Sequence, residues 1–454
     1  MHRRYFLTLV ILVWSGAFLR ATDLPPGATL LDGEYFCWEK WQEPSIAVSH
    51  DGKTIAYVNK GAIWQCQVDG GGSSKLAELK GTIDEFLAKT EFGDARGQEW
   101  KVRKQLGNGP FNQSTVDMSK VDGMQWRRSG KAVVYALADH AQSDIHAARY
   151  QIMEASRTGE VHAIVTIDRD VGDEPHALTA FHVRADNKYI VSTGPRPLIW
   201  DVEANEPVAT PYDYLLPSVT SDRYLGIEID TRQLVLVDEG FKIIKRYNAT
   251  FEPQRNWDLI WSPDERFAIC RTYSNQSLDD SWAGFRIDLE TGAKRALEGY
   301  KGDRFLFVGH SGAVIRIGMR KIEQLEYGDG RNGSYIALVP EGNDPQRDIF
   351  RFDKPRKVSD DWNAVMTYPL ICASSDCKLF AMALPRDSGK PGYLYHLIDR
   401  SGSKWPFPDD PSLLVAPCRV LAFVDEDQKL VARDDTRLFS IHVAAIKAAA
   451  EERK

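Results

Sequence analysis

The chain has 454 residues, of which 43% are hydrophobic and 27% are charged, with 34 glycines and 22 prolines. This composition is typical of a folded globular protein and excludes a disordered chain, a collagen-like repeat and a membrane protein with many spans. The formal net charge of −7 disfavours a nucleic-acid partner, because phosphate backbones require a basic surface. The length allows two or three domains or one large repetitive fold.

Residues 1–21 have the features of an export signal peptide. A basic start at Arg3 and Arg4 precedes an apolar run from Tyr5 to Leu19, and small residues at Ala17 and Ala21 mark possible cleavage positions. The run is shorter than the about 20 apolar residues that span a bilayer, so we expect cleavage, with an uncleaved anchor as the alternative. The mature chain is then secreted or periplasmic, with no integral membrane domain. Its net charge is −10, because three arginines and no acid are removed.

After this segment, a short apolar strand, a polar turn and a second apolar strand recur eight times. The clearest copy runs from Ile46 to Val58 around the turn Asp51-Gly52. Its strands are rich in β-branched and aromatic residues, and its turn holds residues that tolerate tight geometry. The other seven turns are centred on Ser129-Gly130, Asp186-Asn187, Ser221-Asp222, Pro263-Asp264, Ser311-Gly312, Ser375-Asp376 and Asp425-Glu426.

Four short antiparallel strands in each repeat of about 35–60 residues are typical of a β-propeller blade. The sequence therefore predicts an all-β fold: one propeller over residues 32–443, with eight four-stranded blades and seven as the alternative. A strand near Thr29 to Tyr35 is expected to close the ring by pairing into the last blade. The capping-box pattern Thr82-Ile-Asp-Glu85 predicts a short helix within an insertion at residues 80–120, and the alanine-rich residues 444–454 predict a helical tail.

The repeats also resemble a known family. The segments Val48 to Tyr57 and Trp261 to Ala268 are similar to the repeats of TolB-type, WD40-like (PD40) propellers, and Pro175 to Asp201, with its Trp200-Asp201 pair, resembles a WD40 blade. The resemblance implies the propeller fold. It does not imply an activity, because propellers have many functions.

No segment carries a complete catalytic motif. The nearest to a hydrolase elbow, Gly309 to Ala313, has alanine where the motif needs glycine and lies in a strand-turn-strand setting. Histidines concentrate in one region, where His140 and His146 share a predicted loop with Asp144, and further histidines follow at His162, His176 and His182. If three of them converged, they could hold one divalent metal, as in a metal-dependent, lyase-like enzyme acting on polysaccharide. The competing interpretation is that these histidines are structural.

The leading prediction is an exported, non-catalytic, monomeric propeller without a cofactor that binds a protein or a saccharide. The loops that join the second and third strands of the blades lie on one face beside the central opening, and we expect ligands there. Their mixed charge suits a polar ligand. The residues predicted to form this ligand face are His140, Asp144, His146, Arg196, Arg232, Tyr273, Asn275, Asp279, Asp280, Arg320, Arg386 and Lys390.

All six cysteines follow the signal segment, and an even number in an exported chain permits disulfides. Cys372 and Cys377 flank a predicted hairpin turn, and Cys37 and Cys418 lie near the two ends of the fold, so these are the candidate pairs. Cys66 and Cys270 lie in apolar strands and are expected to be small core residues.

Overall fold

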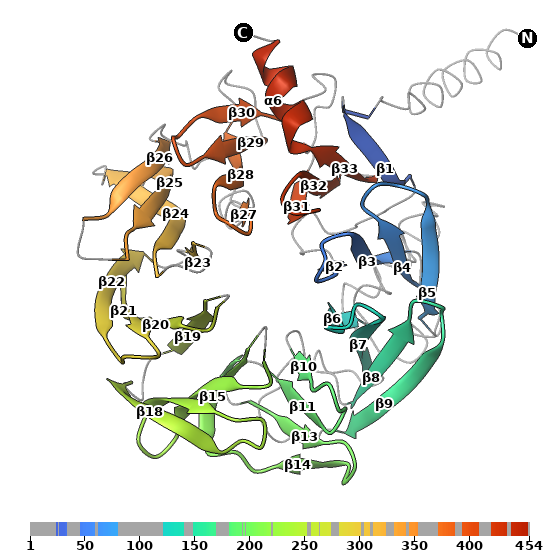
Figure 1. The fold of residues 1–454 in the computed structure, drawn as a ribbon, viewed down its shortest axis with the longest axis vertical. Coiled ribbons are helices and arrows are strands. Elements are labelled where there is room, and N and C mark those ends of the chain that lie inside the picture. Colours follow the sequence, from blue (N-terminus) through green and yellow to red (C-terminus); the bar gives the residue numbers. More distant parts are fainter. Residues whose placement is uncertain are drawn as a thin grey trace, which may run out of the picture.

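The protein is an eight-bladed β-propeller, as the repeats predict (Figure 1). The computed structural model describes residues 24–25, 27–33, 46–59, 62–79, 121–139, 149–168, 181–192, 194–195, 197–218, 221–251, 256–262, 264–273, 281–300, 304–308, 312–323, 331–341, 345–352, 371–385, 393–407, 419–433 and 437–452. Each blade is an antiparallel sheet of four strands that follow one another in the chain, with two exceptions. The short strand β12 (Gly194–Pro195) lies between the second and third strands of blade 3 but pairs into blade 4, and the last blade takes its fourth strand from the N-terminus. The blade count is therefore eight and not seven.

The strands of blades 1 to 4, taken from the central opening outward, are as follows. Blade 1 holds β2 (Ile46–Val48), β3 (Thr54–Asn59), β4 (Ala62–Gln67) and β5 (Ser73–Glu78). Blade 2 holds β6 (Val121–Trp126), β7 (Ala132–Asp139), β8 (Arg149–Ser156) and β9 (Val161–Asp168). Blade 3 holds β10 (Phe181–Val183), β11 (Tyr189–Ser192), β13 (Ile199–Asp201) and β14 (Glu206–Val208). Blade 4 holds β15 (Tyr212–Pro217), β16 (Tyr224–Glu228), β17 (Gln233–Val237) and β18 (Ile243–Thr250).

The remaining blades follow the same order. Blade 5 holds β19 (Asn256–Trp261), β20 (Phe267–Tyr273), β21 (Ser281–Asp288) and β22 (Lys294–Tyr300). Blade 6 holds β23 (Arg304–Phe307), β24 (Val314–Glu323), β25 (Arg331–Val339) and β26 (Arg347–Phe352). Blade 7 holds β27 (Ile371–Ala373), β28 (Leu379–Pro385), β29 (Tyr393–Asp399) and β30 (Lys404–Pro406). Blade 8 holds β31 (Arg419–Val424), β32 (Lys429–Arg433), β33 (Leu438–His442) and β1 (Ala28–Asp32).

Each predicted hairpin turn joins the first strand of a blade to the second, and a Ser-x-Asp pattern explains how several of them form. In blade 1, the Ser49 hydroxyl accepts the backbone N–H of Thr54 at 3.0 Å and donates to the Asp51 carboxylate at 2.6 Å. Gly52 follows with φ of 67°, a conformation that favours glycine. Ser262 with Asp264, and Ser374 with Asp376, make the equivalent bonds in blades 5 and 7. The side chains thus satisfy backbone groups at the point where the chain reverses.

The N-terminal strand closes the ring, as predicted. Strand β1 pairs antiparallel with β33, from Ala28 opposite Ile441 to Asp32 opposite Leu438. The Asp32 carboxylate accepts hydrogen bonds from the Tyr57 hydroxyl and the Asn59 amide of blade 1, both at 2.9 Å. The same strand therefore belongs to blade 8 and contacts blade 1. Both ends of the chain thus hold the contact between the last and the first blade, which we call the seam.

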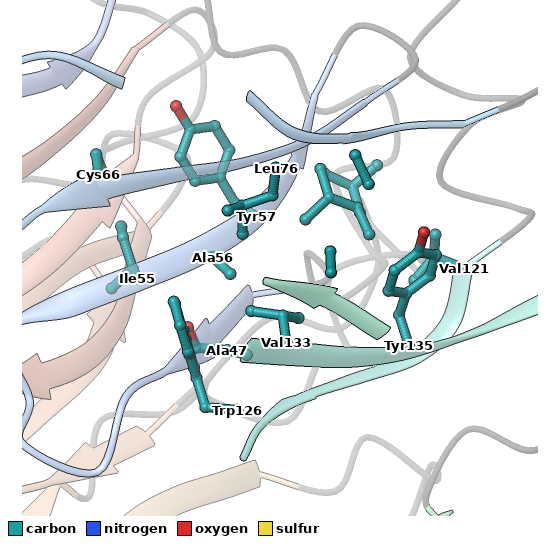
Figure 2. Close-up of a cluster of buried hydrophobic side chains, with 14 of the residues drawn as sticks. Ala47, Ile55, Ala56, Tyr57, Cys66, Leu76, Val121, Trp126, Val133 and Tyr135 are labelled. Atoms are coloured by element: carbon teal, nitrogen blue, oxygen red, sulfur yellow. The ribbon is translucent and has the colours of Figure 1, made fainter. Parts of the chain in front are cut away.

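The hydrophobic core lies between neighbouring blades. One cluster joins residues of blades 8, 1 and 2, and Figure 2 shows its central part, where Ile55, Tyr57 and Trp126 lie among smaller side chains. Ile55 and Tyr57 are fully buried on β3. Both faces of a blade are thus covered by its neighbours, which a ring achieves and an isolated blade does not.

The C-terminal helix α6 (Val443–Glu451) confirms the predicted helical tail. Its buried residues Val443, Ile446 and Ala450 lie on one side, and the helix contacts β30 and β33 outside the ring (Figure 1). Residues 1–21 and the predicted insertion at 80–120 lie outside the described residues. Among the helices of the described residues, none has the length and apolar character needed to cross a bilayer.

The predicted disulfide between Cys372 and Cys377 is wrong in this structure, where both thiols are free. Cys372 lies opposite Ala381 in the β27–β28 ladder, whereas Cys377 lies in the turn with φ of 50° and directs its Sγ to the Phe307 carbonyl oxygen at 3.1 Å. The two side chains therefore pack in different clusters. Cys66 and Cys270 are buried, as expected, while Cys37 and Cys418 lie outside the described residues.

Candidate functional site

A cavity of about 510 Å³ lies where the first strands of blades 1 to 4 end, on the face that carries the first hairpin turns. Strands β2, β6, β10 and β15 each contribute residues, so four blades build its wall. The lining residues are Ala47, Val48, His50, Met124, Gln125, Trp126, Arg127, Arg128, Ser129, Val134, Phe181, His182, Val183, Ala185, Pro217, Ser218 and Asp222.

The apolar part of the wall is fixed by packing against blade 1. Trp126 is 6% exposed and its indole N–H donates to the Ala47 carbonyl oxygen at 3.0 Å. Figure 2 shows the two residues beside each other, where strands of blades 1 and 2 approach. The Arg157 guanidinium lies 4.9 Å from the Trp126 ring. Val48, Met124 and Pro217 are only half-buried and complete the apolar surface that faces the cavity.

Two consecutive arginines join blade 2 to the next two blades. Arg127 pairs with Glu154 in its own blade and donates to the Arg184 carbonyl oxygen of blade 3 at 3.1 Å. Arg128 donates to the Ser221 carbonyl oxygen at 2.6 Å and to the Asp222 carboxylate at 3.3 Å, both in the first turn of blade 4. Charge-assisted bonds of this kind are stronger than neutral ones, so the wall is held by the arginines of one turn.

Inter-blade hydrogen bonds continue around the ring on the same face. Blades 4 and 5 are joined by Ser221 and Glu265, blades 5 and 6 by Arg286 and Gly312, blades 7 and 8 by Ser375 and Asp427, and blades 8 and 1 by Asp425 and Gly52. The cavity therefore belongs to a face in which each first turn is held by a neighbouring blade.

His182 stands in the cavity wall and lacks a hydrogen-bond partner for Nε2 among the described residues. That nitrogen is 3.9 Å from Asp222 Oδ1, which is beyond hydrogen-bond distance. The ring meets Tyr224 edge-on at a centroid separation of 6.2 Å. Burial, together with the positive charge of Arg128, lowers the pKa of His182 to about 4, so the imidazole is neutral at neutral pH.

The predicted ligand-face residues fall mainly outside the described residues, and their role stays a prediction. Arg232 lies in the turn between β16 and β17, with φ of 53°, and forms an ion pair with Asp213 of its own blade. Tyr273 ends β20, and Arg320 lies in β24 opposite Gly333. The residues outside the described part are His140, Asp144, His146, Arg196, Asn275, Asp279, Asp280, Arg386 and Lys390.

The described histidines do not converge. His162 is exposed on β9, the outermost strand of blade 2, whereas His182 lies on β10, the innermost strand of blade 3. The described part of the chain holds no group of three His, Cys, Asp or Glu side chains placed to bind a metal. A metal at His140 and His146, and with it the polysaccharide-active enzyme, stays an untested prediction.

The sequence analysis does not predict that Arg127, Arg128 and His182 line one cavity. A signal was present, because blade 2 has two arginines between the last residue of its first strand, Trp126, and the turn Ser129-Gly130. The sequence does not reveal that their partners are backbone carbonyl groups of two other blades.

The sequence matches no protein-family model and no curated protein. A solved structure of the Dos1 propeller is similar to this chain, with a TM-score of 0.51 and 10% identity over 92% of this chain and 97% of that one. A chain of the mitotic checkpoint complex gives a TM-score of 0.40 and 12% identity, covering 80% of this chain and 90% of that one. The Cps50 (Swd1) β-propeller domain of Myceliophteria thermophila gives 0.36 and 11%, covering 71% and 96%. At 10% identity the likeness to the Dos1 propeller shows the fold alone, a β-propeller.

Proposed function

We propose that this chain is an exported, non-catalytic, monomeric propeller that binds a protein partner through the cavity at the first turns of blades 1 to 4. The observation that carries the proposal is the cavity itself, because its lining combines Met124, Trp126, Arg127 and Arg128. Methionine, tryptophan and arginine are enriched at protein interfaces, and binding energy concentrates where such residues surround a pocket.

The rigidity of the wall supports the same proposal. The hydrogen bonds of Trp126 to blade 1 and of Arg128 to blade 4 hold the lining side chains in place before a ligand arrives. Little side-chain entropy then remains to be lost on binding. The apolar part of the wall suits an aliphatic side chain better than a sugar, since Val48, Met124 and Pro217 supply its half-buried surface.

Selection of displayed random peptides on the purified mature protein tests this function. Selected peptides should bind the parent protein and lose binding to Ala185→Trp, which places a large side chain on an exposed residue at the cavity wall. Ala204→Trp is the matched control, because Ala204 is also an exposed alanine of blade 3 and does not line the cavity. Peptides that bind both variants equally would contradict the proposal, and so would a glycan that binds the parent while no peptide does.

Export and family membership belong to the same proposal. The basic and apolar character of residues 1–21 supports a cleaved signal, which mass determination of the mature N-terminus tests directly. The Ser-x-Asp turns at Ser49 and Ser262 support placement among TolB-type, WD40-like (PD40) propellers. Light scattering of the purified chain tests the monomer.

A further inference from the structure

We infer that the cavity accepts an uncharged hydrogen-bonding group on an apolar stem, such as the side-chain amide of a glutamine presented by the partner. The inference rests on the proposed function and specifies the chemistry of its ligand. It depends on three properties of the wall: paired charges, neutral polar side chains and an apolar surface between them.

The charged side chains of the wall already have partners. Arg127 is paired with Glu154, and Arg128 bonds to Asp222 at 3.3 Å. Behind the wall, Arg184 is paired with Asp186 at 2.8 Å. An ionic ligand group would lose its hydration in the cavity and find no unpaired opposite charge, and such desolvation costs several kcal/mol as an order of magnitude.

Among the remaining polar side chains, His182 and Gln125 are neutral. His182 is uncharged at neutral pH, and its Nε2 is buried, so this side chain adds no charge to the wall. Gln125 is half-buried in the wall and carries an amide that can both donate and accept. A ligand amide or hydroxyl has the same dual character, so it can bond to this wall without bringing a charge.

The apolar residues of the wall explain why the ligand group should have an apolar stem. Met124 and Pro217 are half-buried and lie in the same wall as Gln125 and His182. Methylene groups that contact them leave water, which contributes about 0.8 kcal/mol for each buried CH₂. Two methylenes and a terminal amide describe the glutamine side chain.

Three capped amino acids that differ in charge test the inference: N-acetyl methylamides of glutamine, glutamate and lysine. Each is titrated at pH 7 into the full protein carrying ¹³C-methyl methionine, and the Met124 signal, assigned with Met124→Leu, reports binding. Ligands of this size bind with a Kd of about 1 mM at best. We expect the glutamine probe to bind at least threefold more tightly than the other two. Equal or tighter binding of glutamate or lysine, or no binding of any probe, overturns the inference.

Two variants show whether paired charges are the cause. Asp222→Asn removes the carboxylate that Arg128 contacts at 3.3 Å, so the preference should move toward the glutamate probe. Gln125→Leu should weaken the glutamine probe and leave the other two unchanged. Circular dichroism and thermal melting identify a variant that fails to fold, in which case the other variant still decides. If peptides selected by display depend on the cavity but present acidic or basic residues to it, the proposed function stands and this inference fails.

Discussion

Replacing Leu31 by alanine should weaken the closure of the ring. Leu31 is 3% exposed on β1, and its cluster combines core residues of blade 8, such as Leu438, with core residues of blade 1, such as Ile55 and Tyr57. Removing a buried leucine side chain costs about 2–5 kcal/mol, depending on how far the surroundings relax. Since β1 is the outermost strand of its blade and can relax, we expect the lower part of that range, about 2–3 kcal/mol.

Leu30→Ala is the matched control, because Leu30 is the preceding residue on the same strand and is 44% exposed. We expect its free energy of unfolding to change by about 0.5 kcal/mol or less. Urea unfolding followed by tryptophan fluorescence and by circular dichroism measures both variants, and coincident transitions establish that one unfolding step is observed. Equal destabilisation by the two substitutions would refute the assignment of Leu31 to the seam between the last and the first blade.

Three further predictions concern charge, pH and thiols. Lys429, 6% exposed on its side chain, joins Asp425 of its own blade to Asp69 of blade 1, so Lys429→Met should destabilise the fold by about 1–2 kcal/mol in urea unfolding, and an unchanged midpoint would contradict this. The pKa of His182 falls from 6.5 to about 4 on folding, so the unfolded chain takes up the proton first as the pH drops. As the pH drops from 6.5 to about 4, the free energy of unfolding should therefore fall by up to about 3 kcal/mol more in the parent than in His182→Phe. Burial raises the pKa of Cys66 to about 12 and that of Cys377 to about 11, so both should resist alkylation until the protein unfolds, and rapid labelling of the native protein would disprove their burial.

The propeller could be predicted because its repeat is local. Each hairpin, with its two alternating strands and its turn, lies within about a dozen residues of the chain. Turns such as Asp51-Gly52 and Ser375-Asp376 each join the first two strands of a blade. The cavity could not be predicted in the same way. Arg128 bonds to residues 90 and more positions later in the chain, and no local pattern encodes that distance.

The disulfide prediction failed for a related reason. Cys372 and Cys377 are five positions apart around a turn, and spacing alone made them candidates for a pair. In the observed register the residue opposite Cys372 is Ala381, so the turn places Cys377 beyond the end of the ladder. Hairpin register decides which side chains face each other, and a shift of one residue moves every side chain to the other face of the sheet.

The seam and the cavity share blade 1, so closure of the ring should influence binding. On one side, Leu31 and the Asp32 carboxylate contact blade 1 at Tyr57 and its neighbours. On the other side, β2 of the same blade presents Val48 to the cavity and accepts the Trp126 hydrogen bond. We therefore expect Leu31→Ala to weaken the binding of cavity-dependent peptides, although Leu31 does not line the cavity. The Leu30→Ala control should bind like the parent protein. Unchanged binding by Leu31→Ala, under conditions where it is fully folded, would show that the cavity is independent of the seam.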